Sequence, residues 1–188
     1  MVIVQVVGYW YMVTKETRRI FRIWPLTLLH SVVRTALFFL VFGSFIGSRF
    51  GDIGGFSYMQ FIVPGLIMMS VILNAYNNVV SVVFSAKFQR NIEELLISPL
   101  GTNTIILGWV SSGVIRGSLV GGLVWLTSLL FVPIRMANPP IMLVTLLLTA
   151  IFFSLCGCIA ALFAKTYDQM TIIPTFVLTP LIYLGGVF

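Results

Sequence analysis

Charge is what this sequence has least of. Asp, Glu, Lys and Arg together make up 9% of its 188 residues, whereas hydrophobic residues make up 59%, and the mean hydropathy is +1.08. A water-soluble domain carries about 25% charged residues to cover its surface. A soluble globular protein is therefore excluded, and we expect an all-α membrane protein built as a polytopic helical bundle.

The residues that metal and redox sites require are also scarce. One histidine, His30, excludes a bis-histidine haem site within the chain. The two cysteines, Cys156 and Cys158, lie in an apolar run and are better interpreted as small packing residues than as ligands. The net charge of +6 indicates cytoplasmic loops facing anionic lipid headgroups rather than nucleic acid. We expect no cofactor and no metal.

Catalytic and nucleotide-binding signatures are missing from the sequence. There is no GxxxxGK[ST] P-loop, no HExxH and no GxSxG motif. None of the five acids lies in the middle of an apolar run, which weighs against a proton-coupled carrier. We predict that the chain is not an enzyme and obtains its energy from another protein.

What the sequence does have is long apolar runs. Five runs reach or approach the ~20 residues that a span requires, and they cover residues 25–47, 58–85, 104–132, 139–164 and 171–188. We expect each run to be one span of a single transmembrane domain over residues 1–188.

The basic residues that flank these runs predict the orientation. One set of loops carries seven, namely Lys15, Arg18, Arg19, Arg22, Lys87, Arg90 and Lys165. The other set carries two, Arg49 and Arg135. Because Lys and Arg accumulate in cytoplasmic loops, the N-terminus is predicted to be cytoplasmic.

Two short segments on the cytoplasmic side are amphipathic. Residues 13–24 are expected to form an interfacial helix with a basic face, acting as a simple anchor or in a mechanical role. Residues 86–98 are expected to form a second helix along the surface, which Pro99 ends. Its apolar face comprises Phe88, Ile92, Leu95 and Leu96.

A polar stripe runs along the second expected span. Its residues recur at helical spacing and are Ser70, Asn74, Asn77, Asn78, Ser81 and Ser85. Intramembrane polar groups are costly, so this face should avoid lipid. Two interpretations remain open: interhelical hydrogen bonds of ~0.6 kcal/mol each, or the lining of a translocation path.

The third expected span carries Arg116 beside a ridge of glycines spaced by four: Gly113, Gly117 and Gly121. The ridge predicts close packing against another helix. Arg116 is a candidate for the same path or helix interface as the polar stripe, either snorkelling and hydrogen-bonded or attracting an anion into a cavity. Arg34, in the first span, is expected to snorkel to the cytoplasmic face or to contact the basic helix through water.

Three motifs, in this order, resemble those of type-2 ATP-binding-cassette (ABC) exporter permeases. Residues 55–65 (GFSYMQFIVPG) resemble the start of that family's second span. Residues 87–96 (KFQRNIEELL), with Pro99, resemble the cytoplasmic loop that carries its coupling helix. Residues 174–181 (PTFVLTPL) and 183–188 (YLGGVF) are similar to its fifth-span signature.

The resemblance covers nearly the whole chain from about Thr14, and it is greatest to the YadH-type inner-membrane transport permeases. It implies a multi-pass inner-membrane subunit with six spans. It also implies a permease homodimer joined to two copies of a separate ATPase subunit, exporting drugs, polysaccharides or lipid-linked molecules. The residues placed to couple to the ATPase are Lys87, Phe88, Arg90, Glu93 and Glu94.

Members of that family continue beyond the position of Phe188 with a sixth span. We therefore expect this chain to be a C-terminally truncated permease domain and a poor transporter. An ATP-independent membrane channel or scaffold protein is the alternative function.

Overall fold

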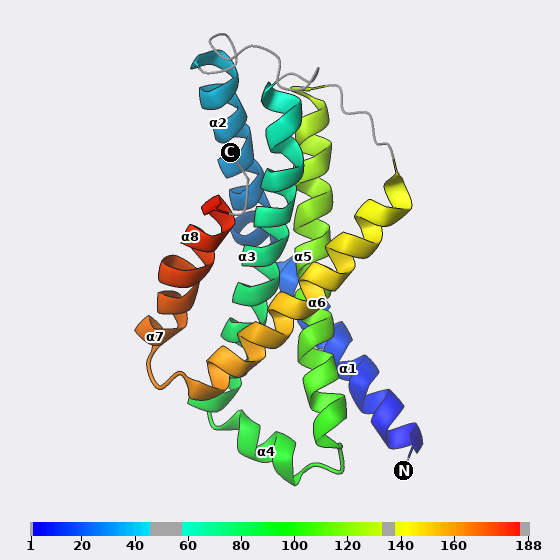
Figure 1. Cartoon of the computed structure of the whole chain (residues 1–188). Helices are drawn as coiled ribbons and strands as arrows, with labels where there is room; N and C mark the ends of the chain where they lie inside the picture. Colours follow the sequence, from blue (N-terminus) through cyan, green and yellow to red (C-terminus); the bar gives the residue numbers. More distant parts are fainter. Residues whose placement is uncertain (1, 46–57, 133–137, 185–188) are drawn as a thin grey trace.

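The computed structural model describes residues 2–45, 58–132 and 138–184, and these residues are almost entirely helical (Figure 1). In chain order the elements are α1 (Val2–Arg22), the π-helix η1 (Pro25–Leu29), α2 (His30–Phe45), α3 (Tyr58–Phe88), α4 (Asn91–Ile97), α5 (Thr102–Leu129), α6 (Pro139–Phe163), α7 (Tyr167–Ile172), the π-helix η2 (Ile173–Leu178) and α8 (Thr179–Ile182). None of the described residues lies in a strand, so the all-α prediction is confirmed.

Three helices are long and apolar enough to cross a membrane: α3, α5 and α6. They correspond to the second, third and fourth expected spans. Helix α1 and residues 27–41 meet the same test only as a pair, and they are bent by 76° relative to each other. The described residues therefore provide three spans, or four if this bent pair crosses the membrane as one. The first and fifth expected spans, 25–47 and 171–188, end in residues outside the described ranges.

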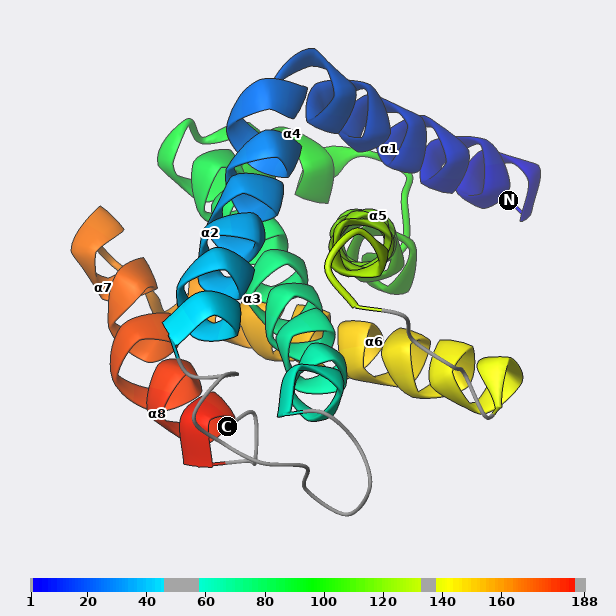
Figure 2. The same cartoon turned by 90° about the horizontal axis from the view of Figure 1, so that it is seen from above.

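The core lies where α3, α5 and α6 pack against one another, and Figure 2 shows the three helices from above. The glycine ridge of α5 makes this approach possible. A Cβ atom added to Gly117 would lie 3.0 Å from Cβ of Ala75 and 3.3 Å from the carbonyl oxygen of Val71, both on α3. On α6, a Cβ atom at Gly157 would lie 2.8 Å from the carbonyl oxygen of Tyr76. The predicted close packing of the ridge is confirmed.

Helix α1 is longer than the interfacial segment expected at residues 13–24, because it begins at Val2. Its inner face packs against α5, where Tyr9 and Ser111 share a hydrogen bond of 2.8 Å. Its outer face exposes Val6, Val7 and Trp10. Exposed apolar residues with an aromatic among them are typical of a helix that lies in a membrane interface.

The expected helix at 86–98 is interrupted. Helix α3 continues through Phe88, the chain turns at Gln89 and Arg90, and α4 begins at Asn91. The backbone of Arg90 has a φ of 59°, in the left-handed region. A residue in that conformation cannot continue a right-handed helix, so the α4 segment is shorter than expected and points in a new direction.

Candidate functional site

A polar network centred on Asn78 joins three helices inside the bundle. Asn78 is completely buried on α3. Its Oδ1 accepts hydrogen bonds from Nη1 of Arg116 on α5, at 3.3 Å, and from Nη2 of Arg19 on α1, at 3.4 Å. Its Nδ2 donates to Oγ of Ser112 on α5, at 3.0 Å. The two arginine bonds are at the long end of the usual range, but they bring two cations to one amide oxygen.

The network includes a buried acid that sequence reasoning did not single out. Glu16, on α1, is 8% exposed, and its Oε2 lies 3.1 Å from Nη2 of Arg19. The contact is an ion pair without hydrogen-bond geometry. Because Arg19 contacts both Glu16 and Asn78, it connects the basic helix α1 to the middle of the membrane domain. No sequence motif signals this link, since Arg19 and Asn78 are 59 positions apart.

A polar cavity of about 210 Å³ lies beside this network, between α2, α3 and α5. Three stripe residues line it, Ser70, Asn74 and Asn77, and so does Arg116. Nδ2 of Asn74 donates to the carbonyl oxygen of Ser70 at 3.0 Å and to Oγ of Ser31, on α2, at 3.4 Å. The structure thus brings four of the six candidate path residues together around one cavity.

The other two candidates lie elsewhere on α3. Asn78 forms the neighbouring network, and Ser81 is exposed. Ser81 follows Asn74 by seven residues, which is about two helical turns or ~10 Å along the axis. Ser81 is therefore too far along α3 to line the cavity where Asn74 contacts α2. The remaining stripe residue, Ser85, is half-buried near the end of α3.

Two of the five candidate coupling residues contact their own chain. Nζ of Lys87 donates to the carbonyl oxygens of Leu162 and Ala164, at 2.8 and 2.9 Å. These carbonyls end α6, where helical acceptors lack partners and a cation is favourable. The ring of Phe88 packs against Tyr167, with centroids 5.2 Å apart. Lys87 and Phe88 therefore fix the α3–α4 turn to the α6–α7 turn.

The other three candidate coupling residues, Arg90, Glu93 and Glu94, are exposed. No ion pair joins Arg90 to Glu94 in the part of the chain that the structure describes. An ion pair between residues four apart needs both residues on one helix, and Arg90 lies outside α4. The two carboxylates are left as the acidic surface of the first turn of α4.

Helix α1 is also bound to the chain that follows α4. The side chain of Gln5 donates from Nε2 to the carbonyl oxygen of Pro99 at 2.9 Å. Its Oε1 accepts from the backbone N–H of Gly101 at 2.8 Å and from Oγ1 of Thr104 at 2.6 Å. Sequence reasoning missed this contact, because a single Gln in an apolar run carries no pairing signal.

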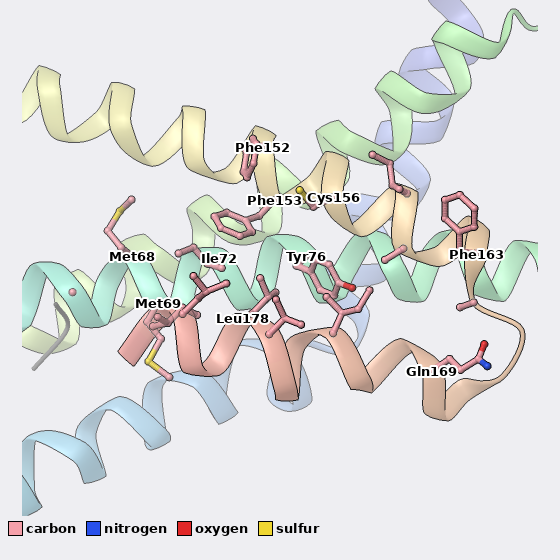
Figure 3. A pocket seen from close by; sticks show the side chains of 18 of the residues that line it. Met68, Met69, Ile72, Tyr76, Phe152, Phe153, Cys156, Phe163, Gln169 and Leu178 are labelled. Carbon is pink, nitrogen blue, oxygen red and sulfur yellow. The ribbon is translucent and has the colours of Figure 1, made fainter. Parts of the chain in front are cut away.

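An apolar groove of about 1040 Å³ runs between α3, α6 and the η2–α8 segment (Figure 3). Among the side chains that Figure 3 labels along it are Ile72, Tyr76, Phe153 and Leu178. The half-buried Cys156 also lines the groove, whereas Cys158 is 5% exposed and packs in the core. The packing role expected for Cys158 is confirmed.

Comparison with known proteins finds similarity over nearly the whole chain. The family model described as ABC-2 type transporter matches residues 7–188. The inner membrane transport permease YadH of Escherichia coli (strain K12) is 59% identical over 174 residues, which cover 93% of this chain and 68% of YadH.

More distant relatives are nodulation proteins. Nodulation protein J of Neorhizobium galegae is 23% identical over 174 residues, 90% of this chain and 66% of that protein. Nodulation protein J of Rhizobium leguminosarum bv. trifolii is 25% identical over 172 residues, 85% of this chain and 62% of that protein. No solved structure matches the chain.

The family match spans nearly the whole chain, and the close relative is named for transport across the inner membrane rather than for catalysis. The apolar helices fit a multi-pass protein of that membrane. The resemblance found in the three motifs is confirmed, and the chain belongs to the ABC-2 type transporter family of inner-membrane permeases.

Proposed function

We propose that this chain is the membrane-spanning permease subunit of an ABC exporter, working as a homodimer with a separate ATPase subunit. Family membership carries the proposal, because ABC-2 permeases are the transmembrane parts of ATP-driven transporters. The interior of the bundle supports it. A polar cavity reaches Asn74, Asn77 and Arg116 on membrane helices, and a polar surface inside a membrane domain is what a translocation path requires.

In the proposed topology the N-terminus is cytoplasmic and the chain contributes five spans. The arrangement of the basic segments supports this orientation. Helix α1, helix α4 and the turn between α6 and α7 lie toward the same end of the bundle, the lower end in Figure 1. Together with the end of α3 and the α3–α4 turn, which hold Lys87 and Arg90, these segments carry the seven basic residues that predict the cytoplasmic side. Arg49 and Arg135, the opposing pair, lie outside the described residues.

Coupling to the ATPase is proposed at α4. Its exposed acids Glu93 and Glu94 offer polar contacts to a partner. Ile92 and Leu95 on the same short helix pack against the core of the membrane domain, so a push on α4 would reach the spans. Lys87 and Phe88 are proposed to act by holding the turn in place rather than by touching the partner.

The test co-expresses the chain with a candidate ABC ATPase subunit from the same organism. Changing Glu93 and Glu94 together to Lys should lower co-purification of the ATPase, or lower the ATP hydrolysis that the permease stimulates, by about tenfold. Asp168→Lys is the control, because it reverses an exposed acid that lies on α7 and not on α4. Unchanged ATPase binding and stimulation in the double reversal would reject α4 as the coupling element. Transport that needs no ATPase would favour a channel.

A further inference from the structure

The polar cavity beside Asn78 is cationic. Arg34 and Arg116 line it together with His30, and none of its described lining residues is acidic. The exposed side chains of His30 and Arg34 make the cavity accessible from outside the bundle. At about 210 Å³ it is several times the ~30 Å³ that one water molecule occupies in the liquid. It has room for a small charged group.

The basic groups of the cavity have unused hydrogen-bonding capacity. The side chains of Arg34 and His30 form no hydrogen bond or ion pair with any described residue. Arg116 contacts Asn78 through Nη1, while its Nε is buried without a hydrogen-bond partner in the described part of the chain. A buried guanidinium with unsatisfied donors favours an oxygen-bearing anion, which can accept two parallel bonds from it.

The groove of Figure 3 offers the opposite chemistry. Its lining is dominated by Met, Ile, Leu and Phe side chains along α3, α6 and η2. Its volume of about 1040 Å³ is at the upper limit of pockets that bury small ligands. In a membrane, acyl chains are the apolar groups available to fill such a groove.

The two spaces adjoin each other. The side chain of Met69 lines both of them. On α3, Ile72 lines the groove and the next residue, Leu73, lines the cavity. At the end of the described chain, Ile182 lines the groove and the next residue, Tyr183, lines the cavity. The methionine side chain between the two spaces is flexible and can pack against ligands of different shape. A molecule with an anionic head and an apolar tail can therefore occupy both spaces at once.

We propose that the cavity and the groove form one binding site for an anionic phospholipid. The phosphate lies between Arg34 and Arg116, and an acyl chain lies along α6 and η2, past Met69. The site gives the permease a preference for anionic over zwitterionic lipid. The site lies in the cavity that the proposed function assigns to a translocation path, but the labelling experiment below needs neither transport nor an ATPase, so the two proposals can fail separately.

The experiment uses the purified chain in neutral detergent and two phospholipids with a photoactivatable group in one acyl chain. One is anionic phosphatidylglycerol and the other is zwitterionic phosphatidylcholine. Crosslinked peptides are identified by mass spectrometry. We expect the anionic lipid to label residues 152–160 and 173–178, and Arg34→Gln to lower this labelling by about tenfold, as loss of one charge-assisted contact predicts.

Arg18→Gln is the matched control, since it removes an exposed positive charge from α1 and should leave labelling unchanged. Arg34→Gln carries the test because Arg34 bonds to no other described residue, whereas Arg116→Gln also disturbs Asn78. A normal thermal unfolding profile of Arg34→Gln shows that folding is intact.

Three results would overturn the proposal. Equal labelling by both lipids, unaffected by Arg34→Gln, would mean that the groove takes any acyl chain. Absence of labelling on α6 and η2 would mean that protein covers the groove, from a second copy or from a further segment of a longer chain. Displacement of the label by millimolar inorganic phosphate, as effectively as by unlabelled phosphatidylglycerol, would mean a site for free anions.

Discussion

Replacing Gly157 with alanine is the most direct test of how closely α6 approaches α3. The added methyl group would lie 2.8 Å from the carbonyl oxygen of Tyr76 and 3.3 Å from Cγ2 of Val80. The Val80 methyl group can turn aside. The carbonyl oxygen cannot, because it belongs to the backbone of a 31-residue helix. The two helices must therefore separate to accept the change.

The expected cost follows from two opposing terms. Overpacking a close contact costs about 1–3 kcal/mol. Replacing Gly by Ala inside a helix returns up to about 1 kcal/mol through helix propensity. We expect Gly157→Ala to lower the free energy of unfolding by about 1–2 kcal/mol. Gly122→Ala is the control, since nothing lies within 4 Å of a Cβ atom there, and it should be neutral or slightly stabilising.

The assay is reversible unfolding in mixed micelles, followed by tryptophan fluorescence from Trp109 and Trp125 on α5. The midpoint of Gly157→Ala should fall below that of the native chain, and the midpoint of Gly122→Ala should not. If both variants were as stable as the native chain, the tight α3–α6 contact would be wrong, and with it the geometry of the groove that α6 borders.

The other predictions use the same unfolding assay. Asn78→Leu should lower the free energy of unfolding by about 1–3 kcal/mol, because Arg116 loses its buried acceptor. Asn78→Asp keeps acceptor oxygens, so its stability should be closer to that of the native chain. Equal stability of the two variants would reject the network. Lys87→Met should cost about 1 kcal/mol through the loss of two bonds to the end of α6, whereas Lys165→Met, at an exposed position, should be neutral. Arg90→Gly should stabilise by up to about 1 kcal/mol by relieving the positive φ; an equal gain in Arg90→Ala would trace it to charge instead.

Sequence periodicity predicted the features that depend on one helix at a time. The four-residue spacing of Gly113, Gly117 and Gly121 predicted a close helix contact, and the contact is present against Ala75 and Val71. The spacing of Ser70, Asn74 and Asn77 predicted a shared polar face, and these residues line one cavity. Such patterns succeed because a helix fixes which residues share a side, whatever lies opposite.

Features that depend on two distant segments, or on one unusual backbone angle, could not be predicted in the same way. The bonds from Lys87 to the end of α6 join positions 75 and 77 residues apart, and nothing in the sequence around Lys87 specifies that partner. The turn at Arg90 uses a left-handed conformation that Gly adopts far more readily. An amphipathic pattern running through Arg90 therefore favoured one continuous helix, and local backbone geometry overrode it.

The two unforeseen contacts of α1 change how coupling can be understood. Near its start, Gln5 binds Pro99, Gly101 and Thr104, on the chain that leads from α4 into α5. Nearly four turns of about 5.4 Å later, Arg19 binds Asn78 inside the bundle. Helix α1 thus spans ~20 Å between the proposed ATPase-facing loop and the polar network that adjoins the cavity. A helix attached at both ends transmits a displacement that a one-point anchor would dissipate. This geometry favours the mechanical role of the basic N-terminal helix over the simple anchor, because an anchor needs only its lipid-facing side.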